Sequence, residues 1–507
     1  MLLPVGTKIR RSSAVVLTRG EGQSLEVYLA ERSKSLRFYG GYWAFPGGVL
    51  DLGLDGSQVE FGQPGHAEGQ ARCAHRELFE EAGVLLGPTS HLVGALERAE
   101  LRRDLIGLQA GEIEARWQSA CSQAGFHPEQ LPSFARMVTP AFSGRRYDTT
   151  FHHALLEGEE HPVVDGEELT AGAFFSPGEL LNRWRRGELY VVPPAVSLLE
   201  HFVRFGLHGG LLSAHRSCSA VMAGQLSGAC LSPGILVAPL KTPTVPPATT
   251  TNTFLVGSQK VYVIDPATPD EGERRRLFDL CDRVESEGSS IAGVLLTHHH
   301  WDHVGSAAAV AERYSVAVGA HPESLARLDL GAAELREVNE GDEFDLGTAP
   351  NGDPDWTLRA IFTPGHAPGH LAFIESSLRG AIVGDLVSTL SSIVIDPPEG
   401  HMETYLASLR RLIDEDIRVL HPAHGLPTRD GVEVVRGYLE HRAERERKLL
   451  GALGPEPLLP SDLVATLYCD TPAAMHGYAE RSLLAGLIKL REQGQARETA
   501  NGWLRQR

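Results

Sequence analysis

Cysteine is scarce in this chain, with six in 507 residues. No two of them form a C-x-x-C pair, so the sequence predicts neither a disulfide framework nor a thiolate zinc site. Long apolar runs are missing as well, because no stretch reaches the about 18 residues that a membrane-spanning helix needs. Residues 1–11 also lack the apolar core of a signal peptide. We therefore expect a cytoplasmic protein with no membrane partner.

Positive charge is in the minority, with 47 Lys and Arg against 65 Asp and Glu and a formal net charge of −18. This balance argues against a nucleic-acid coat protein or a polybasic membrane binder, although it leaves room for a local basic patch. Hydrophobic residues make up 42% of the chain and charged residues 22%, which is ordinary for globular domains and excludes global disorder. At about 100–200 residues per domain, the length predicts more than one domain.

Two changes in composition divide the chain. Residues 205–250 are rich first in Gly and then in Pro and Thr, and residues 451–460 contain three prolines. Both patterns are typical of connecting segments. Before and between them, short β-branched runs alternate with helical periodicity, which predicts a mixed α/β architecture. After the second break, helical periodicity over Ser461–Tyr468 and Ala479–Gln493 predicts a small helical tail.

The strongest functional signal is a histidine cluster that directly follows an apolar run. Residues 298–303 read H-H-H-W-D-H, which contains the pattern H-x-H-x-D-H. Three further residues follow in order where apolar runs give way to loops, namely His366 in T-P-G-H, Asp385 in V-G-D and His424 in P-A-H-G. Imidazole nitrogen and carboxylate oxygen are zinc ligands, and α/β folds place their chemistry in loops at strand ends. The sequence therefore predicts a metal centre.

This set resembles the metallo-β-lactamase superfamily, which implies an αβ/βα sandwich of two sheets between helices and two zinc ions. The resemblance implies one metal held by His298, His300 and His366, a second held by Asp302, His303 and His424, and Asp385 bridging them. The metal pair would lower the pKa of a shared water to near neutrality, so that hydroxide attacks a carbonyl or a phosphorus. We expect Asp302 to take part in catalysis. His299 and His370 match no ligand position, and we expect them to pack against the site or support it.

Three segments narrow the resemblance to the lactamase-like protein 2 group: Thr249–Gly257, I-D-P-P-E-G-H-M at 395–402, and residues 438–446. Members of that group carry a C-terminal winged helix, and the best-studied kind cleaves single-stranded RNA. The resemblance places His441, Arg442 and Arg445 near the metal cleft, where cations suit a phosphate. An ordinary amphipathic helix with paired charges explains these residues equally well.

Two substrates fit the predicted zinc site. The last segment is locally basic, which suits phosphate contacts and favours an endoribonuclease acting on single-stranded RNA. Its cations are Arg481, Lys489, Arg491, Arg497, Arg505 and Arg507. The same fold also hosts glyoxalase-type thioesterases, so hydrolysis of an acyl-CoA thioester is the alternative. Residues 388–394 contain no side chain of obvious catalytic type, which leaves the substrate open.

A carboxylate-rich helix in the N-terminal part carries a second group of candidate site residues. Residues 43–48 read W-A-F-P-G-G and residues 76–83 read R-E-L-F-E-E-A-G. On a helix, Glu77, Glu80 and Glu81 share one face. Carboxylates this close repel one another unless a cation lies between them, and hard oxygen ligands suit Mg²⁺ or Mn²⁺. With Glu68 eight residues before Arg76, the pattern resembles the Nudix box.

The Nudix resemblance implies an α/β/α sandwich that hydrolyses a nucleoside-linked diphosphate with Mg²⁺ or Mn²⁺. Glu77, Glu80 and Glu81 would hold metal, the latter two acting in catalysis, while Gly47 contributes its carbonyl and Arg76 orients the helix carboxylates. Gly48 would take the place of the loop glycine, 14 residues before Gly62, which has the formal spacing. Glu167 or Glu168 could supply a distal base.

The segments around residues 31–40 and 145–149 are similar to the acyl-CoA diphosphatase branch of this family, so CoA is a candidate substrate. The insertion before residue 62 keeps open a nucleotide sensor without turnover. The predicted organisation is a Nudix-like domain at 1–205, a linker at 206–229, a metallo-β-lactamase-like domain at 230–450 and a winged-helix-like tail at 451–507. We therefore expect a two-site metal-dependent hydrolase whose partner is single-stranded RNA or a small acyl or nucleotide substrate.

Overall fold

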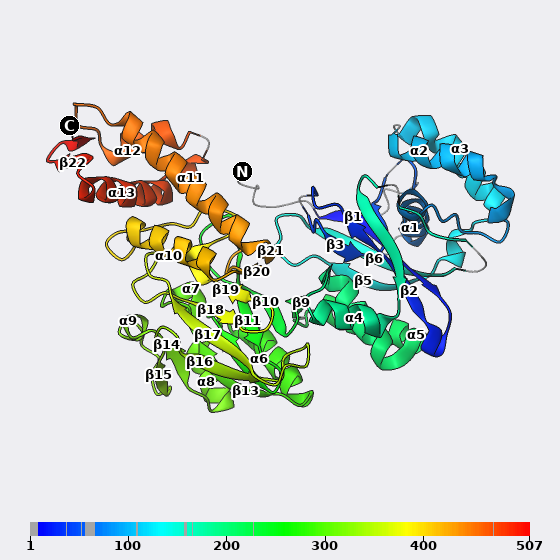
Figure 1. Ribbon diagram of the computed structural model, residues 1–507, viewed down its shortest axis with the longest axis horizontal. Helices are drawn as coiled ribbons and strands as arrows, with labels where there is room; N and C mark the ends of the chain where they lie inside the picture. Colours follow the sequence, from blue (N-terminus) through cyan, green and yellow to red (C-terminus); the bar gives the residue numbers. More distant parts are fainter. Residues whose placement is uncertain are drawn as a thin grey trace. The chain divides into compact units, whose positions relative to one another are not determined.

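The computed structural model describes residues 9–36, 38–51, 53–55, 66–107, 110–156, 160–164, 166–226, 228–469 and 471–506. The chain divides into two compact units (Figure 1). The N-terminal unit comprises Lys8–Pro140 and Arg145–Gln225, and the C-terminal unit comprises Leu226–Arg507 with residues 1–7 and 141–144. Each unit has its own sheets and its own buried core.

The N-terminal unit is built on one sheet of eight strands. They are β1 (Arg10–Arg19), β2 (Glu26–Arg32), β3 (Tyr42–Ala44), β4 (Gly47–Val49), β5 (Ser133–Val138), β6 (Tyr147–Leu155), β7 (Leu169–Phe175) and β8 (Tyr190–Val191). The order is β5-β6-β1-β2-β3-β8, with β4 also on β1 and β7 also on β2. Antiparallel pairing of β1 with β4 sets Gly47 opposite Ala14. A Cβ atom at Gly47 would lie 2.3 Å from the Ser13 carbonyl oxygen, so only glycine allows this approach.

Helix α1 lies against this sheet and carries the predicted carboxylates. The helices of the unit are α1 (His66–Ala82), α2 (Ala95–Gly107), α3 (Ala110–Ala124), α4 (Pro177–Arg185) and α5 (Pro193–Met222), with 3-10 turns η1 (Gly22–Ser24), η2 (Ser90–Leu92) and η3 (Pro128–Gln130). Ala71, Ala74, Leu78 and Ala82 recur at helical spacing and pack in one core with Val15 of β1. The opposite side of α1 meets α3, where the rings of Phe79 and Trp117 lie 5.4 Å apart.

Residues 206–229, which composition predicts as a linker, are helical up to Met222 as part of α5. Gly206 interrupts the helix with φ 67° and ψ −174°. The helix resumes because Gly210, Ala214 and Cys218 recur every four residues and are buried, which is the spacing of one helical face. The glycine-rich composition concealed this periodicity.

The C-terminal unit contains two large sheets. The seven-stranded sheet has β9 (Ala229–Ser232), β10 (Ile235–Lys241), β11 (Thr250–Val256), β12 (Lys260–Ile264), β13 (Ser290–Leu295), β14 (Val318–Ala320) and β15 (Leu335–Glu337). The six-stranded sheet has β16 (Glu343–Gly347), β17 (Trp356–Phe362), β18 (Leu371–Glu375), β19 (Gly380–Ile382), β20 (Val419–His421) and β21 (Thr428–Arg429). Both run in sequence order across the sheet.

Helices cover the outer face of each sheet. The covering helices are α6 (Glu271–Ser286), α8 (Ala307–Tyr314), α10 (Met402–Asp414) and α11 (Gly431–Ala452), whereas the short elements α7 (Trp301–Val304), α9 (Pro322–Leu325) and η4 (Gly384–Leu386) lie in connections between strands. Leu277 of α6 and Val310 of α8 pack on the seven-stranded sheet, whereas Leu409 of α10 and Val435 of α11 pack on the six-stranded one. The expected αβ/βα sandwich is confirmed.

The chain ends in a small helical and hairpin module. It comprises α12 (Pro460–Leu467), η5 (Ala473–Met475), α13 (His476–Glu492), β22 (Ala496–Thr499) and β23 (Gly502–Arg505). Leu463, Leu487 and Trp503 form one buried cluster with Leu449 of α11. The predicted helical tail is therefore present, with an added β-hairpin. Among the residues that the structure describes, no helix has both the length and the apolar character needed to cross a membrane.

Candidate metal centre and carboxylate helix

The seven predicted ligands of the first centre lie in loops that follow strands of both large sheets. His298 and His300 follow β13, and Asp302 and His303 lie in the short helix α7. The remaining ligands come from the six-stranded sheet: His366 between β17 and β18, Asp385 in η4 after β19, and His424 after β20. The strands before these loops are buried, so the loops have firm anchors.

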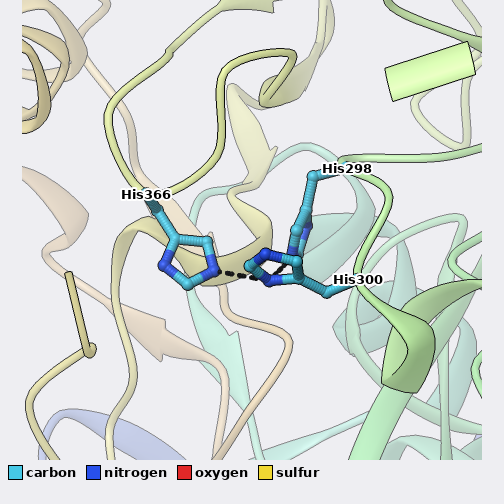
Figure 2. A group of neighbouring side chains, drawn as sticks. All are labelled: His298, His300 and His366. Carbon is cyan, nitrogen blue, oxygen red and sulfur yellow. Dashed lines mark hydrogen bonds between the residues drawn. The ribbon is translucent and has the colours of Figure 1, made fainter. Parts of the chain in front are cut away.

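His298, His300 and His366 converge on one point (Figure 2). Nδ1 of His300 lies 3.0 Å from Nε2 of His298 and 3.0 Å from Nε2 of His366. Zn–N bonds of about 2.1 Å at a tetrahedral angle would place such nitrogens about 3.4 Å apart. The three imidazoles therefore have close to the spacing that one metal ion requires.

Asp302, His303 and His424 form a second group whose ligand atoms all lie within 4.8 Å of one another. Asp385 lies between the two groups. Its Oδ2 is 3.5 Å from Nε2 of His366, and its Oδ1 is 3.3 Å from Nε2 of His424. The two oxygens of one carboxylate thus face the two groups, which is the geometry that a bridging ligand needs.

Hydrogen bonds on the far side of the rings set which nitrogen faces the centre. Nδ1–H of His303 donates to Oδ2 of Asp265 at 2.9 Å, and Nδ1–H of His366 donates to the Val394 carbonyl at 2.9 Å. Nδ1–H of His424 donates to the Thr250 carbonyl at 3.2 Å. Because each Nδ1 is used as a donor on the far side of its ring, Nε2 is the nitrogen that faces the centre and is available to bind a metal, as metal-binding histidines require.

Two supporting residues escaped the sequence analysis. Asp265 is fully buried at the end of β12 and also accepts hydrogen bonds from the backbone and the hydroxyl of Thr297, at 2.7 and 2.6 Å. Asn252 of β11, also fully buried, donates to the Pro422 and Gly425 carbonyls and thereby holds the loop of His424. The signal that could have found them is a polar residue where apolar ones are expected. Asp265 ends the run V-Y-V-I-D, and Asn252 lies inside a strand that is fully buried.

The two histidines without a ligand position lie beside the centre. His370 is fully buried, and its Nε2 accepts the backbone N–H of Asp385 at 3.2 Å. It therefore holds the backbone of Asp385, which is a supporting position beside the centre. His299 lies with its Nε2 3.3 Å from Oε2 of Glu399, a carboxylate that also approaches Nε2 of His300 at 3.7 Å.

The electrostatics of the centre fit a cation. Burial and the neighbouring imidazoles lower the pKa of His298 well below its usual value, so that ring is neutral. Burial alone would lower the pKa of His303, but the carboxylates of Asp302, Asp265 and Asp385 outweigh it and raise that pKa to about 10. Nε2 of His303 and Oδ1 of Asp385 are buried without a hydrogen-bond partner among the described residues. Imidazole nitrogens, carboxylates and two buried, inward-facing atoms without a hydrogen bond are together a donor set suited to a divalent metal.

The carboxylate helix α1 is organised around a buried arginine. Arg76 is 4% exposed and forms a two-pronged interaction with Asp55 at 3.0 and 2.9 Å. Its other terminal nitrogen lies 3.0 Å from Glu80 and 2.9 Å from Glu77. Arg76 thus orients the helix carboxylates, as expected, and Asp55 is a partner that the sequence analysis missed.

The Pro-Gly-Gly loop contacts the same carboxylates. The Gly47 N–H donates to Oε2 of Glu81 at 2.7 Å, and a Cβ atom at Gly48 would lie 2.4 Å from the Glu77 carboxyl group. Burial raises the pKa of Glu77 well above its usual value and that of Glu81 to about 7, although the Gly47 N–H opposes the latter shift. Among the described residues, Glu77, Glu80 and Glu81 do not form one group with ligand atoms within 4.8 Å. Metal binding by these carboxylates therefore stays a prediction.

Other predicted residues of the N-terminal site have less defined positions. Glu68 lies in the first turn of α1, and Glu167 and Glu168 are exposed near the start of β7. Gly62 lies outside the described residues, as does most of the insertion before it. Neither the carbonyl role of Gly47 nor a base at Glu167 or Glu168 is tested by these positions.

Three of the five predicted tail cations that the structure describes are engaged in ion pairs. Arg481 pairs with Asp396, Lys489 lies 2.6 Å from Glu446, and Arg491 lies 3.0 Å from Glu498. Arg497 and Arg505 are exposed, and Arg507 lies outside the described residues. In α11, Arg442 is buried and donates to the Ile393 carbonyl, while Arg445 donates to the Leu467 carbonyl at 2.6 Å. The guanidinium groups of these two arginines therefore bind backbone carbonyl oxygens.

Comparison with known protein families agrees with this geometry. The NUDIX domain model matches residues 8–193, the Metallo-beta-lactamase superfamily model matches residues 246–424, and the Beta-lactamase associated winged helix domain model matches residues 460–503. The resemblances expected from the sequence are confirmed.

Each of the following relatives matches less than half of the chain. Lactamase-like protein adaB of Aspergillus niger is 30% identical over 205 residues, which is 40% of this chain and 58% of that protein. The Beta-lactamase-like protein 2 homolog of Caenorhabditis elegans is 28% identical over 48% of this chain and 79% of that protein. The Atrochrysone carboxyl ACP thioesterase of Passalora fulva is 28% identical over 43% of this chain and 63% of that protein. The chain thus joins a NUDIX domain, a domain of the metallo-beta-lactamase superfamily and a beta-lactamase-associated winged helix domain.

Proposed function

We propose that this protein is a metal-dependent hydrolase whose main active site is a two-metal centre in the C-terminal unit. The convergence of seven ligand-type side chains from four separate loops carries this proposal. His298, His300 and His366 would hold one metal, Asp302, His303 and His424 would hold the other, and Asp385 would contribute a carboxylate to both. Two zinc ions suit this set of nitrogen and carboxylate donors.

When bound, the metals would lower the pKa of a water to near neutrality and provide positive charge for the group under attack. The protein's own side chains do the rest. Asp302 faces the centre with a side chain that is 12% exposed, so one oxygen is positioned to orient the attacking water and accept its proton. Asp265, His370 and the Val394 carbonyl keep the ligands in one orientation, which lowers the cost of reorganisation during the reaction.

For the substrate we favour a small acyl thioester such as an acyl-CoA. Three of the cations that would bind an RNA backbone, Arg481, Lys489 and Arg491, already pair with carboxylates. The relatives include a protein named as an acyl carrier protein thioesterase. A thiolate is also a good leaving group, so its departure needs no further proton donor.

Single-stranded RNA is the second candidate substrate. It is favoured by the relatives named as beta-lactamase-like protein 2 homologs, whose group includes an RNA-cleaving kind, and by the exposed Arg497 and Arg505. The net charge of −18 argues against tight binding of RNA in general.

We further propose that the NUDIX domain hydrolyses the diphosphate of a CoA-type nucleotide with Mg²⁺ or Mn²⁺. The support is the ordered network in which Arg76 and Gly47 hold Glu77, Glu80 and Glu81 along one edge of α1. If both proposals hold, one chain acts on both labile linkages of an acyl-CoA. A nucleotide sensor without turnover is the alternative for this domain.

The first experiment compares substrates for the two-metal site. Zinc-loaded protein is incubated in parallel with a series of acyl-CoA thioesters and with end-labelled single-stranded RNA. Asp302→Ala removes a proposed ligand, and Asp414→Ala, at an exposed position of α10, is the matched control. Thiol release by the parent and the control, absent in Asp302→Ala, supports the thioesterase. RNA cleavage with no thiol release would move the assignment to RNA, and neither activity on zinc-loaded protein would refute both substrates.

A second experiment addresses the NUDIX domain. Glu80→Gln keeps the size of the side chain and removes its charge. Loss of diphosphate hydrolysis in this variant, with the two-metal activity unchanged, supports an enzyme. Nucleotide binding without hydrolysis by the parent would support the sensor instead.

The cytoplasmic location also stays a proposal, supported by the absence of disulfides among the described residues.

A further inference from the structure

One loop connects the metal centre to the winged helix domain. Residues 393–396, here called the relay loop, pass between His366 and helix α13. Ile393 and Ile395 are buried in the same core as Ala485 of α13. The loop is therefore packed against the winged helix domain while it touches a proposed metal ligand.

Within the relay loop, a single peptide group makes both connections. The Val394 carbonyl accepts the hydrogen bond from Nδ1–H of His366 at 2.9 Å. The N–H of Ile395, which belongs to the same peptide group, donates to Oγ of Ser482 on α13 at 3.1 Å. A peptide group is planar and rigid, with its C=O and N–H pointing in opposite directions. The orientation of the Val394 carbonyl is therefore set by the hydroxyl of Ser482.

Contacts on both sides keep this peptide group in place. Arg442 of α11 donates to the carbonyl of Ile393, one peptide group earlier. Arg481 pairs with Asp396, one residue later. Helix α13 is itself fixed, because Lys489, only 5% exposed, lies 2.6 Å from Glu446 of α11 and 3.4 Å from Glu403 of α10. Ser482 thus has a defined position relative to the loop.

We propose that Ser482 is a positioning residue for the metal centre, so that the winged helix domain is a structural part of that centre. Its hydroxyl accepts from Ile395 N–H, which polarises the Val394 carbonyl and strengthens the hydrogen bond that orients His366. Nε2 of His366 is then held toward His300. This inference rests on the proposed two-metal site, and its role is indirect, since Ser482 touches neither metal nor substrate.

A cavity beside Ser482 determines which substitution is informative. A cavity of about 40 Å³ is lined by Ser482, Arg442 and Leu483, among others. This is enough room for a water molecule. A water could therefore replace the hydroxyl in Ser482→Ala. Ser482→Val fills the space with a methyl group instead, and Ser482→Thr has the same shape as Val but keeps the hydroxyl, so the two variants form a matched pair.

The test measures metal affinity and not turnover. Zinc is titrated against a chelator for the parent, Ser482→Val and Ser482→Thr. Loss of a direct partner of a ligand costs about ten- to hundredfold in metal affinity, so loss of this indirect partner should weaken one of two zinc sites by about five- to tenfold. The Thr variant should stay within about twofold of the parent. Cobalt-loaded protein should show an altered visible spectrum in the Val variant only, because the spectrum reports ligand geometry.

The outcomes separate this inference from the proposed function. If the parent binds two zinc ions and the Val and Thr variants bind them equally well, Ser482 is not a positioning residue and the two-metal site stands. If the parent takes up no zinc, the two-metal site fails and this inference fails with it. If Ser482→Val does not fold, Ser482→Cys, whose sulfur is only a weak hydrogen-bond acceptor, takes its place beside Ser482→Thr, and identical cobalt spectra for these two variants would overturn the inference.

Discussion

Replacing Asp265 with Asn tests how the second metal position is built. Oδ2 of Asp265 accepts both from Nδ1–H of His303 at 2.9 Å and from the Thr297 hydroxyl at 2.6 Å, while Oδ1 accepts the Thr297 backbone N–H at 2.7 Å. Asn can keep the bond to the backbone N–H with its oxygen. Its NH₂ group then faces His303, whose Nδ1 must accept and whose proton moves to Nε2. The nitrogen that should bind metal is then blocked, although nothing has changed in size.

The expected loss can be estimated from the role of this partner. Loss of the carboxylate behind a metal-bound histidine costs about ten- to hundredfold in affinity, or about 1.4–2.7 kcal/mol. Since Asp265 and His303 are both fully buried, solvent cannot substitute for the lost bond. The assay is zinc content and chelator competition, with thermal unfolding measured alongside. We expect Asp265→Asn to retain the His298–His300–His366 site and to lose most affinity at the other.

Asp270→Asn is the matched control for this experiment. Asp270 is exposed and caps α6 by accepting the Glu273 backbone N–H at 2.9 Å, a bond that Asn can also make. It should bind both metals as the parent does. Two zinc ions bound to Asp265→Asn with parental affinity would refute the reasoning, because the proposed control of the His303 tautomer would then have no consequence.

Three further predictions concern charge and close packing. Gly48→Ala should lower hydrolysis of the nucleotide diphosphate by the NUDIX domain more than tenfold in a steady-state assay. The reason is that a Cβ atom 2.4 Å from the Glu77 carboxyl group must displace that group. Unchanged activity would mean that Glu77 does not lie beside Gly48. Arg76→Lys should lower the free energy of unfolding by about 3 kcal/mol in denaturant titrations, because Lys cannot form the two-pronged contact with buried Asp55, and a loss below about 1 kcal/mol would contradict this. Metal-free protein should lose stability as pH rises from about 6.5 toward 10. The pKa of His303 in the folded protein is raised to about 10, so protonation of this ring contributes its full stabilisation below the pKa of the unfolded state. That contribution is lost as pH rises through the pKa of the folded state. Zinc-loaded protein should lack this pH-dependent loss in thermal unfolding.

The proposed ligands were predictable because each lies in a short motif at the end of an apolar run. The sandwich fold and the winged helix followed from the resemblance that those motifs carry. The residues that support the ligands had no such local signal. Asp265 lies 38 residues before His303, and Asn252 lies 170 residues before the Pro422 carbonyl that it binds. Spacing along the chain cannot reveal such pairs. Strand order places Asp265, after β12, beside the loop that follows the neighbouring strand β13, whereas Asn252 and Pro422 come from two different sheets.

The tail shows why charge counted along the sequence is a weak guide to binding. Its basic character is real in composition, yet Lys489 is 5% exposed and lies between Glu446 and Glu403, and Arg481 pairs with Asp396 of the relay loop. Each of these carboxylates lies more than 40 residues from its partner in sequence, outside the window in which helical charge patterns are seen. The cations therefore serve to dock α13 against the metal-centre domain. This is why we favour a small acyl substrate over an RNA backbone, and why we expect the winged helix domain to influence metal binding before it influences any partner.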